Sequence, residues 1–169
     1  MNRHVFGITG WKNSGKTTLT ERLVTEFAAR GLRVATVKHA HHAFDIDKPG
    51  TDSFRHRAAG ATETAIVSGR RWALMHELGD ENEPPLEAVL AKLSPADIVL
   101  VEGYKNEPHP KIECRGSTSG QAPLADRVPS VVAIASATGS AKEEGPTFSR
   151  DDIAGIADFI QQYLGMKRG

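Results

Sequence analysis

Short apolar runs alternate with amphipathic segments along most of the chain. The apolar runs predict strands at residues 5–9, 32–37, 98–101, 111–114 and 131–135. Helical spacing of apolar residues, or capping residues, predicts helices at residues 16–30, 53–59, 86–93 and 151–164. Ile98–Val101 is continuously apolar, which is typical of a central parallel strand covered on both faces. Strands that alternate with helices predict an α/β fold, with a mostly parallel sheet flanked by helices.

A β-hairpin is predicted within this alternating pattern. Glu63–Val67 and Trp72–Leu78 have strand character and flank the turn residues 68–71. Trp72 and Leu74 alternate along one face of the second strand. An apolar hairpin inserted in a small α/β domain either packs on the domain's own core or pairs with another subunit. We expect the second use, so that residues 63–78 form a dimerisation element.

Composition narrows the class of protein. The 169 residues suit a single domain over 1–169, and 21 basic residues balance 21 acidic ones. Without a global basic field, nucleic acid is not a favoured partner. The lone Cys114 cannot form an internal disulfide, no run approaches membrane-spanning length, and no signal-like stretch precedes the first strand. We therefore expect a cytoplasmic protein that binds neither nucleic acid nor membrane.

A phosphate-binding loop is predicted between the first strand and the first helix. Residues 10–17 fit the pattern G-x-x-x-x-G-K-[ST], and their strand–loop–helix context favours a site over an ordinary glycine-rich turn. Backbone N–H groups and the helix N-terminus would hold phosphate. Lys16 would reach the β- and γ-phosphates, and the Thr17 hydroxyl would bind Mg²⁺. The expected ligand-binding residues are Gly10, Trp11, Lys12, Asn13, Ser14, Gly15, Lys16, Thr17 and Thr18.

The polar segment 38–48 follows the second strand, so it is predicted at the same carboxyl edge of the sheet. Asp45 or Asp47 would hold Mg²⁺ or orient the attacking water. His39 and His41 would contact phosphates or a second anionic ligand. Two alternatives stay open, which are a zinc site built from three histidines and a solvated polar loop.

The strand at residues 98–101 is followed directly by an acid. Glu102 at the sheet edge needs a partner, because an unpaired buried carboxylate is costly. We favour Mg²⁺ or its water shell over a nearby Arg or Lys. Ser136, after the last strand, is the expected contact for the base. No N-K-x-D element occurs, so the residues alone leave GTP and ATP open.

These segments together resemble the MobB family of molybdopterin-guanine dinucleotide biosynthesis adapter proteins. The loop alone is generic, whereas the pairing of K-H-x-H-H with D-x-D-K-P-G is much more specific. One departure is Ala137, where family members often carry an acid. The matching residues are Gly10–Leu19, Lys38–His42, Asp45–Ser53, Arg57–Ala61, Arg71–Met75 and Leu100–Lys105.

The resemblance implies a phosphate-loop GTPase-like fold, usually a homodimer whose hairpin strands extend the partner's sheet. It implies GTP and Mg²⁺ as cofactors, with at most slow GTP hydrolysis. A separate molybdenum cofactor guanylyltransferase would attach GMP to molybdopterin, and molybdopterin-bearing proteins would be further partners. Carried across, Thr17, Asp47 and Glu102 are metal candidates, and Lys16, Asp45, Asp47 and Glu102 are catalytic candidates.

Two other functions fit the same residues. A small-molecule kinase using ATP or GTP would employ Asp45 or Asp47 as base, with Arg55 or Arg57 gripping the acceptor. No arginine-bearing lid of the usual kinase kind is evident in the sequence, which disfavours this reading. The other is a dimeric binding module without catalytic activity.

Overall fold

A computed structural model describes residues 4–40, 44–116, 122–137 and 145–167 of the chain. The chain divides into two compact units. We call residues 1–39 and 89–169 the sheet unit, and residues 40–88 the hairpin unit. Helix α3 (Leu86–Lys92) crosses the sequence boundary between them. Within the described residues, no helix is long and apolar enough to cross a membrane.

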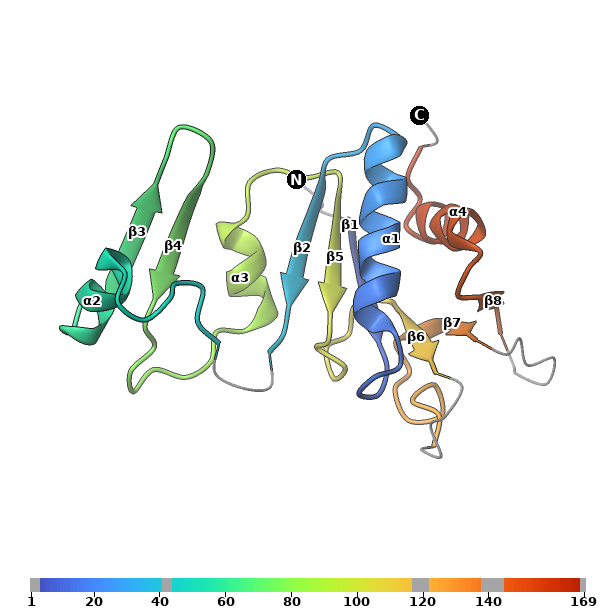
Figure 1. Cartoon of the computed structure of the whole chain (residues 1–169). Helices are drawn as coiled ribbons and strands as arrows, with labels where there is room; N and C mark the ends of the chain where they lie inside the picture. Colours follow the sequence, from blue (N-terminus) through green and yellow to red (C-terminus); the bar gives the residue numbers. More distant parts are fainter. Residues whose placement is uncertain (1–3, 41–43, 117–121, 138–144, 168–169) are drawn as a thin grey trace. The chain divides into compact units, whose positions relative to one another are not determined.

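The sheet unit is built on six strands in the order β2-β5-β1-β6-β7-β8, and every neighbouring pair is parallel (Figure 1). This confirms the predicted α/β class. Strand β8 was not predicted, because three residues after a polar, glycine-bearing segment give no usable periodicity. The strands are β1 (His4–Thr9), β2 (Val34–Lys38), β5 (Ile98–Glu102), β6 (Lys111–Arg115), β7 (Val131–Ser136) and β8 (Thr147–Ser149).

Helices α1 (Lys16–Ala29) and α4 (Ile153–Tyr163) pack together on one face of this sheet. Alternate residues of the strands point at them, since side chains alternate across a sheet. The predicted apolar stripe of α4 docks there, with Ile156 and Ile160 fully buried. The fully buried core residues of this face are Phe6, Ile8, Leu23, Phe27, Ile98, Leu100, Ile112, Ala135, Ile156, Ala157 and Ile160.

The opposite face of the sheet holds a fully buried lysine at the start of β6 and a half-buried histidine just before it. Lys111 is fully buried, and its Nζ donates to the carbonyl of Glu107 and to Ser130 Oγ at 2.8 Å. His109 lies over Gly7, where a Cβ would come within 2.7 Å of its Nε2. Burial, and secondarily the Lys111 charge, lower the pKa of His109 to about 4. The missing side chain at Gly7 therefore makes room for a neutral histidine.

This histidine predicts an acid-sensitive fold. Below pH 6.5 an unfolded His109 binds a proton, whereas the folded ring stays neutral until about pH 4. Stability should therefore fall as pH drops from 6.5 to 4, by about 1–2 kcal/mol once solvent screening of the partly exposed ring is allowed for. Urea denaturation at a series of pH values measures the free energy of unfolding. For His109→Leu this free energy should fall less steeply with decreasing pH than for the wild type. His56 is exposed, so His56→Leu should keep the wild-type dependence of unfolding free energy on pH. The same dependence in all three proteins would contradict His109 as the source of the acid sensitivity.

The hairpin unit contains α2 (Asp52–Ala58) and the antiparallel pair β3 (Glu63–Val67) and β4 (Trp72–His76). The predicted hairpin is confirmed, and β4 ends two residues earlier than expected. Met75 is buried on one face, as Thr64 is. On the other face Trp72 is 69% exposed and Val67, its cross-strand partner, is 76% exposed. In the described chain this hairpin therefore carries an apolar face that the unit itself does not cover.

Candidate phosphate and cation site

The loop between β1 and α1 has the conformation expected of a phosphate-binding loop. Gly10, Asn13 and Gly15 all have positive φ, at 148°, 62° and 95°. A Cβ at Gly10 would collide with the carbonyl oxygen of Cys114, so this position requires glycine. The Ser14 N–H donates to the Trp11 carbonyl at 3.2 Å, which closes the loop on itself. Successive turns of this kind gather backbone N–H groups around an anion.

Lys16 begins α1 and folds back over the loop. Its Nζ donates to the Trp11 carbonyl at 2.7 Å. Burial lowers the pKa of Lys16, and the negative charge of Glu102 opposes that change. The ammonium group is therefore held in a partly desolvated place with one neutral acceptor, where a phosphate oxygen would be a stronger partner.

Two of the three metal candidates, Thr17 and Glu102, meet at the end of β5. The Glu102 side chain is buried, Thr17 Oγ1 donates to its Oε1 at 3.0 Å, and Lys38 Nζ lies 3.5 Å from the same oxygen. Of the two predicted kinds of partner for this acid, the structure has the basic residue, Lys38. Binding of Mg²⁺ by Glu102 and the Thr17 hydroxyl stays a prediction. A hydroxyl and a carboxylate oxygen 3.0 Å apart are oxygen ligands of the type Mg²⁺ prefers. The donor set fits this ion.

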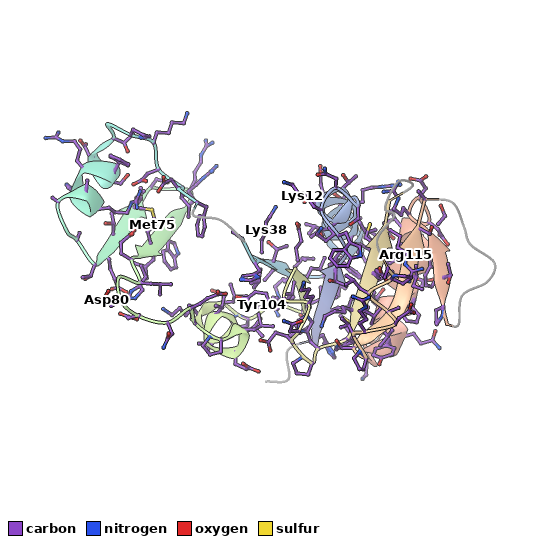
Figure 2. All side chains as sticks on the ribbon, turned by 90° about the horizontal axis from the view of Figure 1, so that it is seen from below. Lys12, Lys38, Met75, Asp80, Tyr104 and Arg115 are labelled. Atoms are coloured by element: carbon purple, nitrogen blue, oxygen red, sulfur yellow. The ribbon has the colours of Figure 1, made fainter. Side chains whose placement is uncertain are left out.

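His39 also lies at this edge, between Glu102 and Tyr104, and the sequence analysis did not single out Tyr104 as a ligand. The His39 backbone N–H donates to the Glu102 carbonyl at 2.9 Å, and its ring stacks on Tyr104 with centroids 4.6 Å apart. Tyr104 has a φ of 46°, which is rare for a residue other than glycine. Figure 2 labels Tyr104 and Lys38. The dipeptide Gly103-Tyr104 after a buried acid was the available signal. His41 falls outside the described residues.

A further group of residues anchors the loop from the β6 side. Trp11 Nε1 donates to the Ala122 carbonyl at 3.0 Å, and Lys105 Nζ lies 5.7 Å from the Trp11 ring centroid. The buried carboxylate of Glu113 accepts from the Leu124 N–H at 2.9 Å, which fixes the segment that carries Ala122. The sequence analysis predicted the strand at residues 111–114 but gave this region no functional role, because the residues around the strand have the composition of a loop.

Asp45 and Asp47 belong to the hairpin unit, and both bind Arg57 there. Arg57 Nη2 lies 2.9 Å from Asp45 Oδ1 and 2.6 Å from Asp47 Oδ1, and its Nη1 lies 3.0 Å from Glu77 Oε1. The hydrogen bond from Arg57 holds the pKa of Asp47 below its usual range. Arg57, which the kinase hypothesis would use to grip an acceptor, is thus ion-paired in the structure. Roles for Asp45 and Asp47 toward a metal stay predictions.

The histidine-rich segment yields no metal cluster in the part that is described. Among the described residues, no group of three or more His, Cys, Asp and Glu side chains could hold a metal ion. Since His41 and His42 are not described, a zinc site from three histidines stays an untested alternative.

Ser136 ends β7 close to a cation that sequence reasoning missed. The Ser136 carbonyl accepts from the backbone N–H of Arg150 at 3.1 Å, and Arg150 Nη1 donates to the Ser14 carbonyl of the phosphate loop at 2.9 Å. A base contact by Ser136 stays a prediction. Arg150 carried no local motif, since its partner lies 136 positions away.

Comparison with known proteins finds a family match and several similar proteins. Residues 5–137 match the family described as "Molybdopterin guanine dinucleotide synthesis protein B". The chain is 36% identical to a molybdopterin-guanine dinucleotide biosynthesis adapter protein of Escherichia coli, over 98% of this chain and 95% of that one. It is 38% identical to its Haemophilus influenzae counterpart, over 97% and 92%. A crystal structure of a MobB homolog from Bacillus stearothermophilus is similar with a TM-score of 0.72, at 27% identity over 96% and 98% of the two chains.

Proposed function

The chain belongs to the molybdopterin guanine dinucleotide synthesis protein B family, and from that premise we propose that it is a GTP-binding adapter for guanine dinucleotide formation on molybdopterin. Its cofactors would be GTP and Mg²⁺, and its own hydrolysis of GTP would be slow. The nucleotidyl transfer itself would belong to a separate molybdenum cofactor guanylyltransferase. The relatives carry the word adapter in their names, which is what directs the proposal away from a free-standing enzyme.

One observation carries the nucleotide part of the proposal. The Thr17 hydroxyl lies 3.0 Å from Glu102 Oε1, directly beside Lys16 and at the carboxyl edge of a parallel sheet. A phosphate loop supplies N–H groups and an ammonium to the phosphates, while a hydroxyl and an acid bind or face the cation. With bound Mg²⁺, the site would neutralise phosphate charge, and Thr17 and Glu102 would hold the ion.

Slow turnover is supported by the state of the other acids. Asp45 and Asp47 are the residues proposed to orient an attacking water, yet both carboxylates are bound to Arg57. The hydrogen bond from Arg57 lowers the pKa of Asp47, so this carboxylate accepts a proton from water less readily. Preference for GTP rests on the family, with Ser136 at the end of β7 as the proposed base contact.

Assembly is the remaining part of the proposal. We expect a homodimer formed through the exposed hairpin face, with the guanylyltransferase and molybdopterin-bearing proteins as further partners. The large exposed Trp72 and Val67 side chains support a partner there, because contiguous exposed apolar surface commonly marks an interface. A cytoplasmic location is expected on the same pathway assignment.

A competition titration tests the function. Purified protein with Mg²⁺ should bind GTP at least about tenfold more tightly than ATP. Alone it should hydrolyse GTP far below the usual enzyme median of about 10 s⁻¹, and adding the guanylyltransferase should increase product formation. Equal affinity for ATP and GTP would overturn the GTP assignment. Rapid phosphate transfer to a metabolite would instead favour the small-molecule kinase.

A further inference from the structure

Arg150 reaches the phosphate loop from the edge strand of the sheet, β8. It directly follows β8, and its Nη1 donates to the Ser14 carbonyl at 2.9 Å. Its backbone is held on both sides, since its N–H donates to the Ser136 carbonyl at 3.1 Å and its own carbonyl accepts from Arg22 Nη1 at 3.2 Å. Arg22 is in turn paired with Asp151 at 2.7 Å. These hydrogen bonds fix the backbone from which the Arg150 side chain extends to the loop.

The Ser14 carbonyl also accepts from a second donor, which belongs to β6. The buried Cys114 Sγ lies 3.2 Å from the same oxygen. Burial raises the pKa of Cys114, so the sulfur keeps its proton and can donate it. A carbonyl oxygen has two lone pairs, and here each has a donor from a different strand region. The orientation of this peptide is therefore set by Arg150 and Cys114 together.

Fixing this carbonyl also fixes the next N–H. A trans peptide is planar, so the Ser14 C=O and the Gly15 N–H point in opposite directions. The two donors approach the oxygen from Cys114 of β6 and from Arg150 after β8, so the Gly15 N–H points away from them. Gly15 N–H is one of the backbone groups that a phosphate loop offers to its anion. Its orientation is a determinant of phosphate affinity.

The position of Arg150 leaves no room for a side chain at residue 15. A Cβ on Gly15 would lie 2.6 Å from Arg150 Nη1, and the residue has a φ of 95°. Within the described residues, Arg150 Nε is buried and has no hydrogen-bond acceptor. Burying a donor without an acceptor is unfavourable, so the side chain is kept here in spite of that loss. Packing alone does not account for a charged group in this position.

We propose that Arg150 is a positioning residue, which orients the Ser14–Gly15 peptide so that the Gly15 N–H faces a phosphate of the bound nucleotide. The inference rests on the proposed function, and extends it to a residue outside the loop motif. Arg150 also adds a permanent positive charge beside the phosphates. It acts through the loop backbone and takes no chemical part in turnover.

Nucleotide binding by Arg150→Met tests this role. We expect affinity for GTP and GDP to fall about tenfold, while millimolar guanidinium added to the Arg150→Ala protein restores most of it. Arg150→Lys should lose less, about threefold, because the charge remains. Arg33→Met is the matched control, since Arg33 pairs with Asp97 at the opposite end of the sheet and should bind nucleotide as the wild type does.

A nitrogen-15 label on glycine supplies a readout that a merely structural role would not change. The Gly15 amide proton should shift downfield when the wild type binds GTP, and should shift much less in Arg150→Met and Arg150→Lys. Wild-type affinity with an unchanged Gly15 shift in both variants would overturn the proposal. Inorganic tripolyphosphate separates the two hypotheses. If it binds in an Arg150-dependent way while GTP does not, the proposed function fails and this inference stands; if neither probe binds the wild type, both fail.

Discussion

Replacing Lys16 with alanine is expected to weaken GTP binding roughly a hundredfold, which corresponds to about 3 kcal/mol. In the structure Lys16 Nζ has the Trp11 carbonyl at 2.7 Å, and burial lowers its pKa. A triphosphate would exchange that neutral acceptor for charged oxygens, so the variant loses a charge-assisted bond in a partly desolvated place. Isothermal titration calorimetry with GTP and Mg²⁺ measures the loss.

The same loop provides the control. Lys12 has an exposed side chain, and Lys12→Ala should reduce affinity by less than about tenfold. Urea denaturation should show that neither variant is much destabilised, because Lys16 makes one hydrogen bond to a neutral group. Wild-type GTP affinity in Lys16→Ala would mean that the nucleotide binds elsewhere.

The sequence predicted the parts of the candidate site that are encoded locally. Glu102 was identified because a continuous apolar run ends in an acid, and a buried strand that ends so needs a partner at the sheet edge. Thr17 and Lys16 were identified from a pattern whose spacing is fixed by the loop itself. Glu102, which accepts from Thr17, and Lys38 end two neighbouring parallel strands, and the strand order brings them together.

What the sequence did not locate depends on contacts between distant segments. Arg150 donates to a carbonyl, and every residue has a carbonyl, so no residue type at the other end marks the pair. The Arg57 contacts with Asp45 and Asp47 were also not predicted, since an arginine on a short helix binds phosphate or a carboxylate equally well by type. Sequence indicates which groups need partners, whereas the fold selects among the candidates.

Introducing a charge on the hairpin is expected to have the second large effect, which follows from the two faces of β3 and β4. Residues on one face alternate with those on the other, and the pairs Val67–Trp72 and Ala65–Leu74 share a face. Trp72 is 69% exposed and Leu74 is 46% exposed, although both are large and apolar. Asp at Trp72 removes the aromatic anchor and adds a charge to a surface that the proposed dimer would desolvate. We expect dimer affinity to fall by a hundredfold or more, about 3 kcal/mol.

Sedimentation velocity over a range of concentrations distinguishes a dimer from a monomer, and nucleotide titration of the same sample reports on the site. Trp72→Asp should be monomeric while binding GTP within about twofold of the wild type, because Trp72 belongs to the hairpin unit and the phosphate loop to the sheet unit. Phe44→Asp is the matched control, since Phe44 is also an exposed aromatic side chain of residues 40–88 but lies off the hairpin. It should remain dimeric. An unchanged dimer in Trp72→Asp would exclude the hairpin face as the interface, and loss of the dimer together with GTP affinity would instead mean that dimerisation completes the nucleotide site.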